Sequence, residues 1–190
     1  MAYTDIQICN ISMTLIGETA ISSLESPATP VETMLANIYE PLKEDALKGF
    51  KPNFAMKRAS LTEDTSDPAF EFENQFVLPT DYLIADRINQ DDEQLINYRV
   101  EGQLMLTDEE TVELEYVANI DESLFTSDFA LMLALKIAVY VCFSITKNLQ
   151  KEDRLKKDYA FQRKKVIAND SIENRVVRQS KETQWLTERI

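Results

Sequence analysis

The first stretch of the chain has apolar residues at helical spacing between two boundary signals. From Ile8 to Leu15 the apolar residues recur every three or four positions, which places them on one face of a helix. Thr4 and Gln7 have the spacing of a capping box, and Gly17 can adopt the left-handed conformation that ends a helix. The pattern predicts a helix over residues 5–16.

A second helix is predicted after a short polar segment. The sequence Thr29-Pro30-Val31-Glu32 is another capping box, with proline at the first helical position, where its missing N–H has no intrahelical partner to lose. Further along, Pro41 deletes one backbone hydrogen bond of the helix. The segment to Lys48 is therefore predicted to be either kinked or a separate short helix ended by Gly49, and we favour the kink.

Between residues 52 and 117 the spacing changes to the alternation of β-strands. It is clearest over residues 112–116, where apolar side chains alternate with two glutamates. Glu101-Gly102 can turn the preceding residues back into a hairpin, and the polar stretch Thr62 to Pro68 is predicted to be a loop. We expect one small antiparallel sheet, whose other strands cover residues 54–61, 76–78, 83–88, 98–100 and 104–106.

The most apolar run of the chain, Phe129 to Ile145, is hydrophobic on nearly all sides. Thr126 or Ser127 can cap a helix that continues to about Asn148. The run is shorter than the roughly 20 residues that span a bilayer, and it contains Lys136. We predict a buried core helix, enclosed by its own domain or partly by neighbouring subunits, and no membrane contact.

A charged helix and a C-terminal arm are predicted to follow. The apolar positions of this helix are Leu155, Tyr159, Phe161 and Val166. After Asn169 the periodicity weakens, so the tail is predicted to become ordered by docking on a partner, with Trp185 as its anchor. A tail folded back on its own subunit is the alternative. The candidate partner-binding residues are Arg163, Lys164, Lys165, Arg175, Val176, Val177, Arg178, Trp185, Leu186 and Ile190.

Together these elements predict an α+β fold, mainly α: a helical bundle with a small antiparallel sheet and an extended C-terminal arm. Residues 1–149 would form the body, closed by the long apolar helix 127–148, and residues 150–190 the charged helix and docking arm. The start of the chain has neither a basic segment nor an apolar one, so no secretory signal is visible and we expect synthesis in a cytoplasm.

Composition narrows the chemistry that this fold can perform. The chain has no histidine, three dispersed glycines and two cysteines. Histidine-dependent catalytic sites, glycine-rich phosphate loops and zinc sites are therefore excluded, and we expect no enzyme activity, metal or cofactor. Cys9 and Cys142 lie among apolar residues and are predicted to be buried packing groups. The acidic runs Asp91-Asp92-Glu93 and Asp108-Glu109-Glu110 are interpreted as solvated loop charge.

Charge is divided unevenly along the chain, whose net charge is −13. Residues 1–128 hold 26 acidic and 7 basic side chains, whereas residues 129–190 hold 7 acidic and 13 basic ones. Duplex DNA is bound largely through Lys and Arg, so the acidic body argues against a DNA-binding repressor. In the basic C-terminal part, Lys and Arg alternate with Asp and Glu, as they do on helices that contact solvent or protein.

Seven short segments resemble, in order, the head-to-tail adaptor proteins of tailed bacteriophages, which include tail tubular protein A and head-completion adaptors. The likeness covers roughly residues 8–145. Pro52 stands where the family usually has tryptophan, and the arm after Gln150 does not align. The matching segments are CNISMTLIGE (9–18), ISSL (21–24), YEPLKEDAL (39–47), NFAMKRASL (53–61), FVLPTDYL (76–83), YRVEG (98–102) and LEYV (114–117).

The resemblance implies a structural virion protein at the portal vertex, assembled in the host cytoplasm as a ring of typically twelve copies. Such a ring binds the portal protein, extends a channel through which genomic DNA passes without specific binding, and docks the next tail, nozzle or ring protein. An acidic body suits such a channel, because like charge disfavours phosphate contact. The alternatives are a tail-associated peptidoglycan hydrolase, suggested by the many carboxylates, and a cytoplasmic helical regulatory protein.

Overall fold

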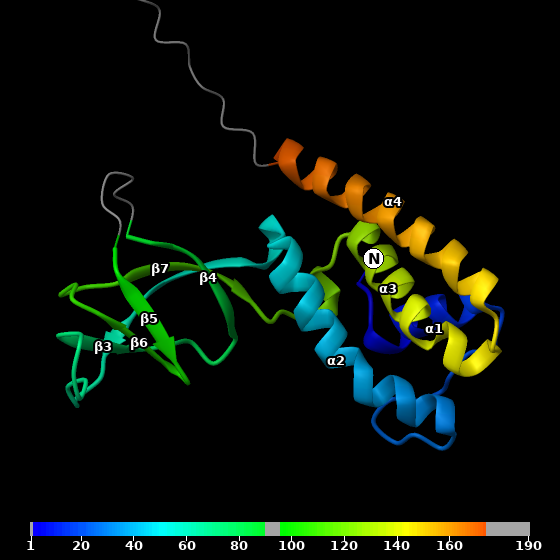
Figure 1. Ribbon diagram of the computed structural model, residues 1–190, viewed down its shortest axis with the longest axis horizontal. Helices are drawn as coiled ribbons and strands as arrows, with labels where there is room; N and C mark the ends of the chain where they lie inside the picture. The colour runs from blue at the N-terminus through cyan, green and yellow to red at the C-terminus, as the bar shows by residue number, and fades with distance from the viewer. Residues whose placement is uncertain (1, 90–95, 174–190) are drawn as a thin grey trace, which may run out of the picture.

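The computed structural model describes residues 2–89 and 96–173, which form a helical part and a sheet part arranged along one long axis (Figure 1). The fold is α+β and mainly α, as predicted. The described strands form two small antiparallel sheets where we expected one. Helices come from both ends of the described sequence, so the sheet part is an insertion between them.

Helix α1 (Asp5–Ile16) has the predicted bounds, and its start and end have the predicted causes. The Thr4 hydroxyl accepts a hydrogen bond from the Gln7 N–H, and the Gln7 side chain accepts one from the Thr4 N–H, both at 3.2 Å. Gly17 ends the helix at φ 76°, in the left-handed region that favours glycine. Local sequence alone therefore determines both ends of this helix.

Helix α2 (Pro30–Phe50) starts at the predicted capping box and continues through Pro41 as one helix. Pro41 is exposed, so the carbonyl that loses its hydrogen bond can be solvated. The predicted stop at Gly49 is wrong, because the helix ends at Lys51, whose N–H bonds to the Leu47 carbonyl at 2.8 Å. Lys51 takes the left-handed conformation that the prediction gave to glycine.

Helix α3 (Ser127–Thr146) is the centre of the helical part and packs against α1, α2 and α4 (Leu149–Glu173). The helix starts at the predicted residue and ends two residues before the predicted end, and at 20 residues it is long and apolar enough to cross a membrane. More than half of its most apolar stretch is nevertheless buried inside the protein. Lys136 makes an ion pair with Asp45 of α2, which accommodates the one charge within this run. Thr126, one of the two predicted capping residues, occupies the N-cap position, but its side chain makes no capping hydrogen bond.

The three-stranded sheet adjoins the helical part, and the four-stranded sheet lies beyond it (Figure 1). In the first, β7 (Glu113–Ala118) pairs with both β1 (Met56–Ser60) and β4 (Tyr82–Ile88). The second has the order β2 (Thr62–Glu63), β3 (Asn74–Val77), β6 (Leu104–Thr107) and β5 (Tyr98–Glu101). Residues 62 and 63 thus belong to a strand, although the prediction assigned them to a loop.

The hairpin of β5 and β6 is confirmed. Glu101 pairs with Leu104, which leaves Gly102 and Gln103 as a two-residue turn. Gly102 has φ 62°, a conformation that two-residue hairpin turns require and glycine adopts without strain. The turn therefore fixes the register of both strands.

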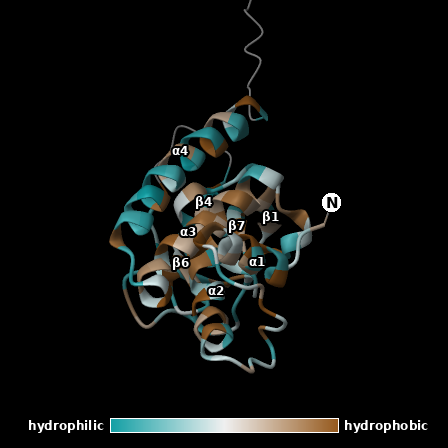
Figure 2. Cartoon of the chain, turned by 90° about the vertical axis from the view of Figure 1, so that its right-hand side faces the viewer, coloured by the Kyte–Doolittle hydropathy of each residue, from teal (hydrophilic) through white to brown (hydrophobic). Residues whose placement is uncertain are grey.

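Apolar residues gather around α3, while α4 turns a largely hydrophilic side outward (Figure 2). At the junction with the sheets, Phe54 and Phe125 pack edge-on against Phe129, with ring centroids 5.0 and 4.9 Å away. Cys9 and Cys142 are buried and unpaired, as predicted. Burial, aided by the charge of Asp5, raises the pKa of Cys9 to about 12, which keeps this thiol protonated and unreactive.

Candidate partner-binding surface

Helix α4 packs on α3 through one narrow face. Leu155, Gln162 and Val166 are buried, and Tyr159 between them is partly buried. Their spacing of three or four residues puts all four on the same side of the helix. The Gln162 amide donates to the Asp128 carbonyl at 3.0 Å, so the polar member of this face has a partner in the core. Most of the remaining surface of α4 faces solvent.

Both ends of α4 are attached to other segments. Near its start, Lys151 Nζ lies 2.6 Å from the carbonyl oxygen of Ile16, at the C-terminus of α1. A cation is favourable there because the last carbonyls of a helix carry partial negative charge. Near its end, the Asp170 carboxylate accepts from the Asn53 N–H, and the Asn53 amide donates to the Asp170 carbonyl, both at 2.9 Å. Helix α4 thus connects the end of α1 to the segment that leads into β1.

The side of α4 opposite its packing face is basic and carries an exposed aromatic ring. We name this surface the α4 outer stripe. Of the four apolar positions that the sequence marks on this helix, Phe161 is the exposed one, with 72% of its surface accessible to solvent. The side chain lies on the helix face opposite Val166, with cationic side chains within one turn or two on the same face. The α4 outer stripe consists of Arg154, Lys157, Phe161, Lys164 and Lys165.

Most cations of the α4 outer stripe have no acidic partner in the described part of the chain. Arg154 lies 3.8 Å from Asp158, one turn along the same exposed helix. For Lys157, Lys164 and Lys165 no ion pair is formed within the described residues. Flexible cations around an exposed aromatic ring can pair with carboxylates while the ring supplies apolar contact area. The stripe therefore suits an anionic partner surface.

Three of the residues predicted from sequence to bind a partner are on α4. Lys164 and Lys165 belong to the outer stripe, whereas Arg163 is exposed on another side of the helix. The predicted residues Arg175, Val176, Val177, Arg178, Trp185, Leu186 and Ile190 lie outside the described residues. Sequence reasoning missed Lys157 and the role of Phe161. The spacing Lys157-Phe161-Lys165, one residue every helical turn, is the signal that could have found them.

A second surface, of opposite charge, lies at the far end of the four-stranded sheet. Two loops meet there, because the Asp108 carboxylate accepts from the Glu73 N–H at 3.1 Å and Asn74 donates to the Glu109 carbonyl at 3.0 Å. Phe70 beside them is 77% exposed. We name this surface the acidic tip, and it consists of Glu71, Glu73, Asp108, Glu109 and Glu110.

Several carboxylates of the described residues accept hydrogen bonds within the fold. A glycosidase needs one carboxyl group whose pKa is raised. Within residues 2–89 and 96–173, five carboxyl groups have a shifted pKa, and all five shifts are downward: Glu32, Asp45, Asp81, Asp121 and Asp128. Burial acts to raise the pKa of Asp81 and Asp128, but the hydrogen bonds that each group accepts favour its charged form and lower the pKa overall. No group of three potential metal ligands is found within residues 2–89 and 96–173. The run Asp108-Glu109-Glu110 is loop charge, as predicted, and Asp91-Asp92-Glu93 lies outside the described residues.

Comparisons with known proteins add no family assignment. The chain matches no protein-family model, and a search of the curated proteins finds no match either. Function is therefore inferred from the two surfaces described above and from the order of the sequence motifs.

Proposed function

We propose that this chain is a structural subunit of a head-to-tail adaptor ring, which binds a portal protein on one side and the next tail component on the other. The observation that carries the proposal is the division of the subunit into a helical part and a projecting sheet part (Figure 1). Each part presents its own exposed surface, so two partners can be bound at once. The ordered motifs that resemble phage adaptors supply the identity of those partners.

Three of the segments that carry the resemblance coincide with regular elements of the fold. CNISMTLIGE covers most of α1 and its glycine stop, and YEPLKEDAL lies within α2. NFAMKRASL contains the short 3-10 turn η1 (Asn53–Ala55) and the whole of β1, which joins the two parts. These segments therefore form helices and strands of the subunit itself. The outer stripe of α4 and the acidic tip lie outside them and are available to bind partners.

The deciding experiment is size analysis of the purified protein alone and after mixing with the portal protein of its virus. Mass photometry and negative-stain imaging would show a ring that co-migrates with the portal if the proposal is correct. A chain that stays monomeric and never joins the portal would refute it. Release of soluble fragments from labelled peptidoglycan would instead support the hydrolase alternative.

The proposed docking arm can be tested separately from the body. Truncation after Glu173 keeps every contact described for α4, including the one between Asp170 and Asn53. We expect the truncated protein to keep a folded, helical body by circular dichroism and to be incorporated less efficiently into portal complexes. Unchanged incorporation would show that the arm does not contribute to docking.

A further inference from the structure

The four-stranded sheet and its loops form one of the most acidic regions of the molecule. Residues 62–78 and 96–112 carry nine acidic side chains and a single basic one, Arg99. Arg99 already pairs with Glu71 at 3.0 Å and contacts Glu101 at 3.7 Å. The loop carboxylates held together by the bond from the Glu73 N–H to Asp108 have no cation of their own among the described residues. This local excess of negative charge lacks a compensating partner within the subunit as described.

The α4 outer stripe has the opposite excess. Between residues 154 and 165 the chain holds six basic side chains and one acidic, Asp158. Each surface also includes exposed aromatic area, Phe161 on the stripe and Phe70 beside the acidic tip. The two surfaces are therefore complementary, because their charges have opposite signs and each has an aromatic ring among or beside its charged groups.

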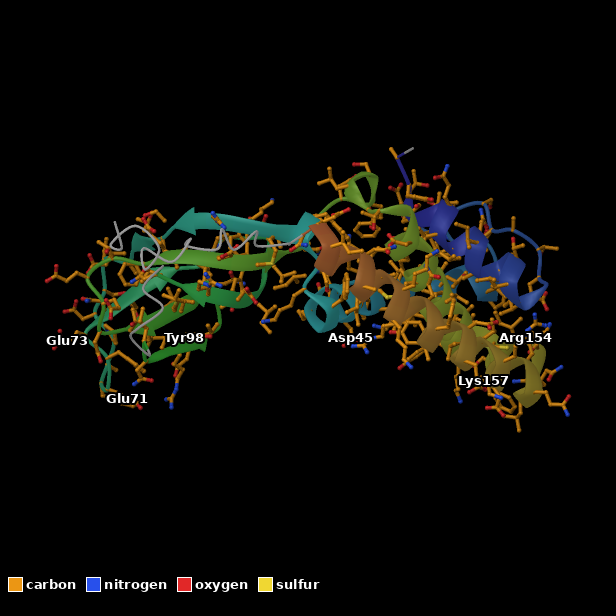
Figure 3. All side chains as sticks on the ribbon, turned by 90° about the horizontal axis from the view of Figure 1, so that it is seen from above. Asp45, Glu71, Glu73, Tyr98, Arg154 and Lys157 are labelled. Atoms are coloured by element: carbon orange, nitrogen blue, oxygen red, sulfur yellow. The ribbon has the colours of Figure 1, made fainter. Side chains whose placement is uncertain are left out.

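The two surfaces cannot meet within one subunit. Figure 3 shows Arg154 and Lys157 at one end of the molecule and Glu71 and Glu73 at the other. Opposite charge at opposite ends favours front-to-back association of identical subunits. Such a contact is heterologous, and it closes into a ring when the rotation between neighbours permits.

We propose that the α4 outer stripe of one copy of this chain binds the acidic tip of a second copy. Tip carboxylates pair with Lys157, Lys164 and Lys165, and Phe161 packs beside them on the neighbour. The inference specifies the subunit interface of the proposed ring, and it rests on the proposed function because that function supplies the ring. It assigns the subunit interface to charges that lie outside the segments resembling phage adaptors.

The test uses full-length charge-reversal variants. The stripe variant is Lys157→Glu/Lys164→Glu, and the tip variant is Glu73→Lys/Glu110→Lys. A control for the stripe variant, Lys48→Glu/Lys51→Glu, makes the same change in net charge at the end of α2, where both side chains are partly exposed and form surface ion pairs. Circular dichroism would verify that each variant is folded. Self-association is measured by sedimentation velocity at low and high ionic strength, and ring formation by imaging with the portal protein.

We expect the wild-type protein to self-associate at low ionic strength, and salt to weaken the contact because it screens exposed charges. Each reversal should weaken association by about tenfold or more, whereas the control should behave like the wild type. Mixing the stripe and tip variants should restore association, since every contact between them again joins opposite charges. Restoration by mixing distinguishes a direct contact from a general effect of charge.

Three results would overturn the inference. The first is normal association of both reversal variants, and the second is a wild type that does not self-associate either alone or with the portal. The third is a stripe variant that loses duplex DNA binding while its self-association is unchanged, which would make α4 a nucleic-acid surface.

The portal measurement separates this inference from the proposed function. Rings of both reversal variants on the portal would refute the interface and leave the adaptor function standing. The opposite result is a protein that self-associates in a salt-sensitive way that the reversals abolish, yet never joins the portal. That result would support the interface and refute the adaptor function.

Discussion

Nζ of Lys43 in α2 lies 2.9 Å from Oε1 of Glu122, in the short 3-10 turn η2 (Glu122–Leu124) that precedes α3. Both side chains are largely withdrawn from solvent, and the Tyr39 hydroxyl donates to the same carboxylate oxygen at 3.2 Å. This small network joins α2 to the segment through which the chain returns from the sheets to the core helix.

Replacement of Glu122 by alanine should destabilise the protein by about 3 kcal/mol, because it leaves the Lys43 ammonium buried without its main partner. The measurement is urea unfolding. Glu44→Ala is the matched control, since it removes the exposed pair of Glu44 and Lys48 in the same helix. That loss should cost at most about 0.5 kcal/mol. Equal effects of the two substitutions would show that burial of the Lys43 pair is energetically unimportant.

Glu32 makes stability depend on pH in the acid range. Its carboxylate accepts from the Ser22 N–H, the Ala28 N–H, the Ser22 hydroxyl and the Thr29 N–H, and these bonds, led by the first, lower the pKa of Glu32 to about 2. A carboxyl with a lowered pKa stabilises the folded state above its unfolded pKa, near 4.5, and loses that contribution as the pH falls toward 2.

The corresponding variant is Glu32→Gln, followed by thermal unfolding across this pH range. We expect the variant to have a lower Tm than the wild type at neutral pH. The difference should shrink as the pH falls from about 4.5 to about 2, because the wild-type carboxylate is then protonated. A difference in Tm that is constant with pH would assign the effect to packing and not to the charge of Glu32.

Alanine at two glycine positions should change stability in opposite directions. Gly17 has φ 76°, which a side chain makes unfavourable, so Gly17→Ala should destabilise by about 1 kcal/mol. Gly49 lies inside α2 with open space where the Cβ of an alanine would lie, so Gly49→Ala should stabilise by about 0.5 kcal/mol. Denaturant unfolding of both variants measures the two signs. A shared sign would show that backbone conformation does not decide the effect at these positions.

The two faces of α4 should respond differently to truncation of one side chain. Leu155→Ala removes a buried group and should cost about 2 to 4 kcal/mol of unfolding free energy. Phe161→Ala removes an exposed ring and should change stability by less than about 0.5 kcal/mol, while weakening self-association or portal binding. Unfolding and binding are measured on both variants. Loss of stability with Phe161→Ala and unchanged binding would show that the ring is structural.

The elements that the sequence predicted well are those whose causes lie within a few residues. Both bounds of α1 follow from Thr4, Gln7 and Gly17, and the β5–β6 hairpin follows from Gly102. These are short-range signals, since a cap or a turn is formed by neighbours along the chain.

The division into two sheets could not be predicted in the same way. Strand β7 pairs with β1 across more than fifty residues, and the register of that pairing depends on packing between distant segments. The exposed face of α4 was also not predictable from the sequence. Apolar residues at every third or fourth position do not show which of them pack against another helix. Phe161 is exposed because α3 contacts only the narrow face defined by Leu155 and Val166. The spacing Lys157-Phe161-Lys165 places these residues on one face of the helix, but only the packing of α4 on α3 shows that this face is exposed.

The attachment of Asp170 to Asn53 also has a mechanical consequence. Asn53 stands three residues before β1, at the crossing from the helical part to the sheets. A force applied to the chain beyond Glu173 would therefore be transmitted through the two hydrogen bonds between Asp170 and Asn53 to the segment that leads into β1. In an assembly that must resist tension, capture of the C-terminal end would stiffen the crossing between the two halves of the subunit.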